Sequence, residues 1–298
     1  MSAKTIQNRT DLRKRHRSKP LPYLLLIPNM VLLGLFTFYP FIRGIYLSLC
    51  VTTPLGEVGR FVGIANYKRV LNSPTFLNTM KVTFDFAIRV GGGTFLISML
   101  LSSICIQKRA GSRAYQTMFS MPVALASVPV CAIAMTFFRV DGFINTLFGG
   151  NTAWLSTKAT ALDTVSIITV WNQVGMSFIF LLVGFRNVPD TLVESSMLDG
   201  ANYFQRLKNV YIPIASPQIF YVIFLNIISS FKAFGAINVL TEGGPSESTN
   251  ILIYALYSNA FLRGRFETAC VYAMVLCTVI FLVSRLQFIL EKRMVHYQ

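Results

Sequence analysis

Polar and ionisable side chains recur inside long apolar segments of this 298-residue sequence. Such groups are expensive to place in a membrane, and they usually mark the path of a solute or ion or pair with one another. The set is Asp85, Arg89, Asn172, Gln173, Asn226, Ser229, Ser230, Lys232 and Asn238. The chemistry that these residue types suggest is therefore the recognition and transfer of a solute.

Asp85 and Arg89 lie four residues apart, so they share one helix face and can form an ion pair. An alternative function for the chain, an ion-coupled secondary transporter, needs coupling carboxylates near the middle of the membrane. Asp85 is the one plausible candidate for that role. We expect Arg89 to be its partner, which favours a structural role for the pair.

The other polar groups fit either a substrate pathway or contacts between helices. Trp171 could stack on the face of a sugar ring, and Asn172 and Gln173 follow it directly. Asn226 and Ser230 share a helix face through their spacing of four. Amides and hydroxyls of this kind line a pathway or form interhelical hydrogen bonds, and the sequence leaves both interpretations open.

Lys232 is the most informative of the candidate pathway residues. A cation near the middle of the membrane, away from an obvious acid, favours an anionic cargo such as a phosphate or a uronate. Alternatively, the long Lys232 side chain extends toward the membrane interface and has no role in cargo recognition.

The motifs of common catalytic sites are missing from the sequence. No Gly-Lys pair occurs, so the chain lacks the GxxxxGK[ST] loop that cradles the phosphates of ATP. The two histidines, His16 and His296, lie near the termini, and no GxSxG elbow is present. The five cysteines form no CxxC pair and resemble apolar packing residues. We therefore expect no catalytic residue, no metal site and no cofactor in this chain, which is not an enzyme.

The composition indicates an all-α integral membrane protein. Hydrophobic residues make up 53% of the chain and charged residues only 13%, against about 25% in soluble domains. The net charge of +15 accompanies no groove-reading motif, which argues against nucleic-acid binding. About 20 apolar residues of helix span a bilayer. Six segments qualify, at about 22–43, 82–106, 117–139, 163–186, 218–240 and 267–290.

The lysines and arginines predict the orientation of these spans. Sixteen of them flank the spans on the side of the two termini, and nine lie on the other side. Because positive residues are enriched in cytoplasmic segments, we expect both termini in the cytoplasm. The chain then divides into a basic cytoplasmic tail (1–21), a transmembrane domain (22–290) and a short C-terminal cytoplasmic tail (291–298).

A polar, turn-rich stretch, ESSMLDGANYFQRLKNVYIPIASP (194–217), interrupts the apolar chain on the cytoplasmic side. Asp190 is a candidate helix N-cap, and Gly200 permits either a sharp bend or a close contact. Met197, Ala201, Phe204 and Leu207 follow at spacings of four, three and three, which predicts one shared helix face. Such a helix could lie at the lipid interface or insert into a groove on a partner protein.

This stretch resembles the signature cytoplasmic loop of permease subunits in bacterial ATP-binding-cassette (ABC) importers. That pattern places Glu-Ala-Ala before Asp-Gly-Ala, an aromatic residue, apolar positions and a proline. The matching residues are Glu194, Ser195, Ser196, Asp199, Gly200, Ala201, Phe204, Leu207, Val210, Ile212 and Pro213, with Ser-Ser in place of Ala-Ala. Further segments resemble the subfamily that imports carbohydrates and glycerol phosphates. They are FVGIANYKRVL (61–71), YQTMFSMPVALASVPV (115–130), DGFINTLFG (141–149), VWNQVGMSFIFLLVGFRNVPDTLVE (170–194) and LTEGGPSEST (240–249).

The resemblance implies the type I ABC importer permease fold, with a cytoplasmic coupling-helix loop at about 188–217. It implies that this loop docks on a cytosolic ATPase, and that Asn226, Ser230 and Lys232 lie where the fifth span lines the central cavity. With Trp171, Asn172 and Gln173, they are the candidate residues of the substrate pathway. The implied partners are a second homologous permease in a heterodimer, two ABC ATPase subunits that bind ATP and magnesium, an extracytoplasmic solute-binding protein and membrane lipid. The implied location is the bacterial inner membrane, and the implied cargo is a sugar, an oligosaccharide or a glycerol phosphate.

Overall fold

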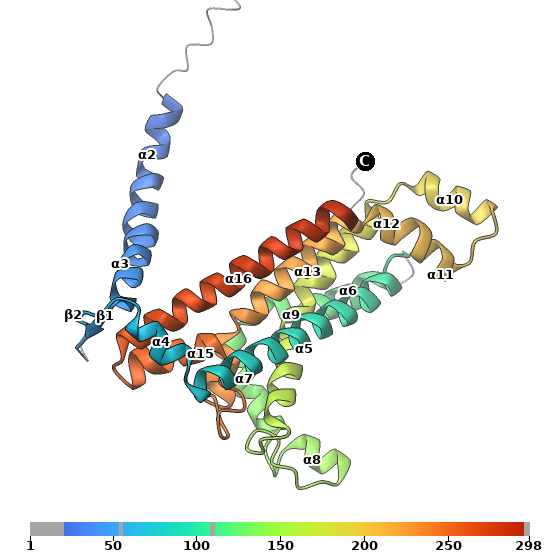
Figure 1. Ribbon diagram of the computed structural model, residues 1–298. Coiled ribbons are helices and arrows are strands. Elements are labelled where there is room, and N and C mark those ends of the chain that lie inside the picture. The colour runs from blue at the N-terminus through green and yellow to red at the C-terminus, as the bar shows by residue number, and fades with distance from the viewer. Residues whose placement is uncertain (1–20, 54–55, 108–110, 295–298) are drawn as a thin grey trace, which may run out of the picture. The chain divides into compact units, whose positions relative to one another are not determined.

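The computed structural model describes residues 21–53, 56–107 and 111–294 (Figure 1). The predicted basic tail lies almost wholly outside them, whereas the last helix continues through the first four residues of the predicted C-terminal tail. Most of the described chain is helical, which confirms the predicted all-α class. It forms two compact units, residues 1–47 and 48–298.

The N-terminal unit contains one long apolar helical run. Its elements are α2 (Leu21–Leu33), the π-helical η1 (Gly34–Phe38) and α3 (Tyr39–Ser48). The proline ring of Pro40 would clash with the carbonyl four residues earlier in a regular helix. The wider turn of η1 accommodates it, with the Tyr39 N–H donating to the Gly34 carbonyl oxygen. Residues 25–48 are long and apolar enough to cross a membrane, as predicted for the first span.

The second unit begins with a two-stranded hairpin and continues as a helix bundle. Its elements are β1 (Cys50–Thr52), β2 (Val58–Phe61), α4 (Ala65–Leu71), α5 (Pro74–Ile104), α6 (Ser112–Ser120), η2 (Met121–Ala124), α7 (Ser127–Phe137), α8 (Phe143–Phe148), α9 (Ala161–Arg186), α10 (Asp190–Leu198), α11 (Tyr203–Arg206), η3 (Leu207–Tyr211), α12 (Ile212–Ile214), α13 (Ser216–Phe231), α14 (Phe234–Leu240), α15 (Leu252–Tyr257), η4 (Ser258–Leu262) and α16 (Phe266–Met294). The strands are antiparallel, with Cys50 opposite Phe61 and Thr52 opposite Val58.

Five helical runs of the described chain can span a membrane, or six when one bent pair is included. The bent pair replaces the continuous span predicted at 117–139. Its two parts, Ser112–Ala124 and Ser127–Phe137, meet at 102° because Leu125 and Ala126 adopt extended backbone. Pro129 lies in the first turn of α7, where no intrahelical N–H bond is lost, so the helix restarts there without strain.

Helix α9 is the centre of the second unit. It packs against α5 and α13, and all three run side by side in Figure 1. Buried apolar side chains of α5 and α9, among them Phe86, Val90, Val165 and Ile168, form one cluster with residues of α14. Small residues let the helices approach: a Cβ at Gly175 would lie 2.9 Å from Cγ2 of Val123 and 3.2 Å from the Ser120 carbonyl oxygen.

The Gly175→Ala variant is therefore expected to lower stability, although alanine is the better helix former. The added methyl group meets backbone atoms that cannot move aside, and overpacking of this kind costs about 1–3 kcal/mol. Gly92→Ala on α5 is the matched control, because a Cβ there meets no atom within 4 Å. Thermal unfolding of the purified chain in detergent should show a lower midpoint for Gly175→Ala and an equal or higher one for Gly92→Ala. Equal midpoints for both variants would contradict the tight contact.

Candidate functional site

The loop between α9 and α13 (residues 187–215, here the connecting loop) begins with helix α10. This helix ends in a Schellman motif: the Gly200 N–H donates to the Met197 carbonyl oxygen and the Ala201 N–H to that of Ser196, both at 3.0 Å. Gly200 has a φ of +78°, the left-handed conformation that glycine adopts without a Cβ penalty. A Cβ there meets nothing within 4 Å, so glycine serves the predicted bend and not close packing.

A second short helix, α11, starts at once after the bend. Asn202 and Gln205 form a capping box, with bonds of 2.9 Å and 2.8 Å between each side chain and the other residue's backbone N–H. Sequence reasoning missed these two residues, although the Asn-x-x-Gln spacing just before an apolar stretch is the usual signal. The capping box and the Schellman motif together fix the angle between α10 and α11.

Two sequence predictions for the connecting loop are wrong. Met197, Ala201, Phe204 and Leu207 do not share one helix face, because α10 ends at Leu198 and the chain reverses before α11 begins. Asp190 does not cap α10 either. The N-cap is Pro189, and Asp190 is the first helical residue, where its charge still lies near the positive end of the helix dipole.

One side of the connecting loop is fastened to the bundle. Val193, Tyr211 and Ala215 are buried with Phe185 of α9 in a single apolar cluster. The Tyr203 hydroxyl donates to the Ser103 carbonyl oxygen of α5 at 2.5 Å. Burial raises the pKa of the Tyr211 phenol above its ordinary value, and the nearby Arg206 partly opposes this rise. The loop is therefore attached to both α5 and α9.

The other side of the loop exposes large apolar side chains. Leu198 is 90% exposed, Phe204 77% and Met197 48%. The remaining predicted loop residues are exposed or half-buried: Glu194, Ser195, Ser196, Asp199, Gly200, Ala201, Leu207 and Pro213. Apolar side chains held out on a rigid frame are typical of a surface that another protein covers.

A second group of predicted residues gathers around two cavities in the bundle. Asn172, Gln173 and Lys232 line a cavity of about 290 Å³ between α7, α9, α13 and α14. Asn172 and Gln173 also line a neighbouring cavity of about 260 Å³, together with Asn226. Ser229 contributes to both cavities. The structure thus brings together five residues that the sequence spreads over two spans.

Three buried polar atoms at these cavities have no hydrogen-bond partner within the described residues. They are Nδ2 of Asn172, Oε1 of Gln173 and Nδ2 of Asn226. The Oδ1 atom of Asn226 accepts a 2.7 Å bond from the Ser177 hydroxyl, so this amide is held in place. Buried polar atoms normally find a partner. Their arrangement suits water or the hydroxyl groups of a polar solute.

Lys232 lies where the fifth predicted span is interrupted. Helix α13 ends at Phe231 and α14 begins at Phe234, with Lys232 as the C-terminal cap of α13. The positive charge is thus close to the negative end of the α13 dipole. The break places Lys232 at the wall of the 290 Å³ cavity.

Two predicted pathway residues lie apart from these cavities. Trp171 precedes Asn172 on α9, and successive residues of a helix point about 100° apart. Its half-exposed ring lines a larger, mostly apolar cavity of about 770 Å³ instead. Ser230 is buried and donates to the Ile227 carbonyl oxygen at 2.7 Å.

Asp85 and Arg89 form the predicted ion pair. The guanidinium binds both carboxylate oxygens of Asp85, at 2.8 Å and 3.0 Å, and also binds Asp163 at the start of α9. Sequence reasoning missed Asp163, whose only signal was an acid in the first turn of an apolar helix. A carboxylate already held by a guanidinium is a poor carrier of a coupling ion, so the geometry gives no support to the ion-coupled alternative.

Known proteins resemble the chain over nearly its whole length. It is 29% identical to the sn-glycerol-3-phosphate transport system permease protein UgpA of Pectobacterium atrosepticum, over 97% of this chain and 100% of the relative. The Agrobacterium fabrum protein of the same name is 28% identical, over 94% and 97%. A crystal structure of a bacterial ABC transporter involved in the import of the acidic polysaccharide alginate contains a chain with the same fold. Its TM-score is 0.83 at 18% identity, over 96% of this chain and 100% of that chain.

The sequence profile of one family matches residues 88–296, more than two thirds of the chain. That family is described as the binding-protein-dependent transport system inner membrane component. The matched region contains both the connecting loop and the two polar cavities. The chain therefore belongs to the family of binding-protein-dependent transport system inner membrane components, and it is a permease subunit of an ABC importer.

Proposed function

We propose that this permease forms half of an import pathway for a polyhydroxylated solute, either a carbohydrate or a glycerol phosphate. The observation that carries the proposal is the pair of adjoining cavities, which are lined by unpaired amide groups and, in one of them, also by Lys232. Amides suit hydroxyl groups, and the ammonium group suits a phosphate or carboxylate. Relatives named for sn-glycerol-3-phosphate and a fold neighbour from an alginate importer fit this class of cargo.

The proposed assembly contains a second homologous permease in a heterodimer, two cytosolic ATPases and an extracytoplasmic solute-binding protein. Both termini and the connecting loop lie in the cytoplasm, in accordance with the distribution of lysine and arginine. Because the sequence has no phosphate-binding loop, ATP and magnesium bind to the partner ATPases. The exposed side chains Leu198 and Phe204 are the parts of the loop that enter a cleft on the ATPase.

The mechanism follows from how the loop is attached. ATP brings the two ATPases together, and their movement displaces the connecting loop. The loop is hydrogen-bonded to the end of α5 and packed against the end of α9. The helices therefore move with it as a rigid group and open the cavities to the opposite side of the membrane. ATP binds the two conformations with different affinity, and this difference drives the alternation of access.

The experiment that tests this proposal is purification of the chain from its native membrane, followed by an ATPase assay. We expect a subunit bearing GxxxxGK[ST] to accompany the chain, and the cargo-loaded binding protein to stimulate ATP hydrolysis. Recovery without an ATPase, together with uptake that follows an ion gradient, would contradict it.

Lys232→Met is expected to weaken uptake of an anionic cargo about tenfold or more while changing uptake of a neutral sugar less than about twofold. The variant keeps an unbranched side chain of nearly the same length but removes the charge-assisted hydrogen bonds, each worth about 1.5–3 kcal/mol. Transport of the two kinds of solute into proteoliposomes measures the effect. Lys158→Met, in the exposed segment before α9, is the control for loss of one positive charge. Equal losses for both cargoes would show that Lys232 supports structure and not recognition.

A further inference from the structure

A polar pocket of about 420 Å³ lies at the end of the bundle opposite the connecting loop. Three arginines line it: Arg69 of α4, and Arg263 and Arg265 of the turn between η4 and α16. Glu267 is the one carboxylate among its lining residues. The solute pathway and the loop use none of these residues.

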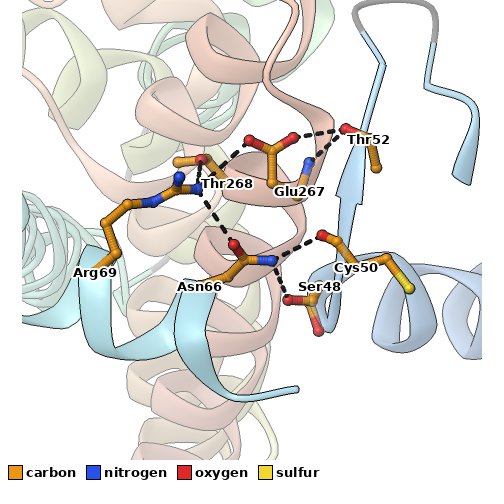
Figure 2. A network of polar contacts seen from close by, with 7 residues as sticks. All are labelled: Ser48, Cys50, Thr52, Asn66, Arg69, Glu267 and Thr268. Atoms are coloured by element: carbon orange, nitrogen blue, oxygen red, sulfur yellow. Dashed lines mark hydrogen bonds and ion pairs between the residues drawn. The ribbon is translucent and has the colours of Figure 1, made fainter. Parts of the chain in front are cut away.

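Glu267 is fully engaged by neighbouring groups, as Figure 2 shows. Its Oε2 accepts a 2.6 Å bond from the Thr52 hydroxyl, and its Oε1 lies 3.5 Å from Nη2 of Arg69. The same nitrogen donates to the Thr268 hydroxyl at 3.4 Å. Glu267 and Arg69 therefore join the hairpin, α4 and α16, and they neutralise one of the three positive charges.

The positive charges of Arg263 and Arg265 are not balanced in this way. Neither side chain has an ion pair within the described residues. The backbone of their turn is fixed, because the Arg263 N–H donates to the Ser258 carbonyl oxygen at 3.0 Å and the Arg265 N–H to that of Asn259 at 2.8 Å. Gly264 between them has a φ of +61°, which glycine accepts readily. Two guanidinium groups on a rigid turn are a preformed arrangement for a phosphate.

Exposed apolar side chains flank the charged turn. Phe261 and Leu262 come directly before Arg263 and are 68% and 62% exposed. Leu77, in the first turns of α5 beside the pocket-lining Ser73 and Thr75, is 61% exposed. A small soluble anion would leave these apolar side chains exposed to water, whereas the acyl chains beside a phospholipid headgroup would cover them.

We propose that this pocket binds the phosphate of an anionic phospholipid headgroup. Arg263 and Arg265 bind the phosphate oxygens, Ser73 and Thr75 line the same pocket, and the acyl chains lie along Phe261, Leu262 and Leu77. In the orientation proposed above, the lipid belongs to the extracytoplasmic leaflet. There it stabilises the junction of the hairpin, α4, α5 and α16. Glu267 and Arg69 already link three of these elements, the hairpin, α4 and α16.

The test is native mass spectrometry of the purified full chain, titrated with phosphatidylglycerol, with phosphatidylcholine, or with inorganic phosphate alone. We expect phosphatidylglycerol adducts on the wild-type chain and about a tenfold or greater loss of occupancy in the Arg263→Gln/Arg265→Gln variant, since each arginine near an anionic lipid surface strengthens binding about fivefold. The Arg263→Lys/Arg265→Lys variant should retain part of the binding. The matched control is Arg60→Gln/Lys158→Gln, which removes two exposed charges outside the pocket.

Equal phosphatidylglycerol occupancy in the wild type and in a folded Arg263→Gln/Arg265→Gln variant would overturn the proposal. So would equal retention of phosphatidylcholine, which lacks the net negative charge. Displacement of all bound lipid by millimolar inorganic phosphate would also overturn it, because it would assign the pocket to a soluble anion. The thermal unfolding midpoint of each variant, measured in detergent without added lipid, separates loss of binding from loss of folding.

Discussion

Phe204→Asp is expected to release the ATPase from this permease and to abolish ATP-driven uptake. The Phe204 ring is 77% exposed, so the substitution removes little that holds the chain itself together. In the proposed complex the same ring fills a cleft on the ATPase, and truncation of a buried aromatic anchor at an interface costs about 2–4 kcal/mol. A charge buried in the cleft adds to that loss. Association should weaken by at least about thirtyfold in co-purification or in a titration with the ATPase.

Leu147→Asp on α8 is the matched control for this prediction. Leu147 is also an exposed apolar residue on a short helix, at 63%, and it lies outside the connecting loop. Both variants should keep the wild-type unfolding midpoint, since exposed substitutions usually change stability by less than about 0.5 kcal/mol. Full ATPase recovery with Phe204→Asp would show that the loop's exposed side chains meet lipid and not protein.

The spans and the chemistry of the loop were predictable because local signals determine them. Twenty apolar residues report a span wherever they occur. A glycine at the end of a helix indicates a bend, and Gly200 indeed adopts the left-handed conformation just after α10. The pairing of Asp85 with Arg89 follows from a spacing of four on one helix.

The errors in the sequence analysis arose where two signals competed. The spacing of Met197, Ala201, Phe204 and Leu207 matches a single helix, but the bend at Gly200 divides them between two helices. The apolar run at 117–139 reads as one span, and its extended residues Leu125 and Ala126 turn it by 102°. An apolar run predicts that a segment lies in the membrane, but it does not predict whether the helix there is straight or bent.

The cavities could be predicted only in part, because they depend on contacts between distant spans. Asn172 and Gln173 line the same cavity as Lys232, and only the packing of α9 against α13 and α14 brings them to it. Trp171 was expected with them because it is adjacent in sequence, yet the helical rotation of about 100° per residue turns it to another face. Asp163 gave no long-range signal that it would join Asp85 at Arg89.

Gly200→Val tests whether the angle between α10 and α11 transmits the movement of the ATPase. Left-handed backbone costs an ordinary L-residue about 1–2 kcal/mol, and a β-branched side chain makes it a genuine outlier. Valine should therefore break the Schellman motif and shift Phe204 relative to Leu198. We expect uptake into proteoliposomes to fall about tenfold or more. The unfolding midpoint should fall by only a few degrees, because the cost is limited to the strained backbone and a Cβ here meets no neighbouring atom.

Gly200→Asn separates the bend from the glycine itself. Asparagine tolerates the left-handed conformation, so it can keep the φ of +78° and with it the Schellman hydrogen bonds. If the conformation is what matters, Gly200→Asn retains most of the transport activity that Gly200→Val loses. If both variants lose activity equally, the surface of the ATPase must contact Gly200 so closely that no side chain fits, and the residue belongs to the interface. Activity retained by both would mean that the movement passes through α10 alone, by way of Val193 and its buried neighbours.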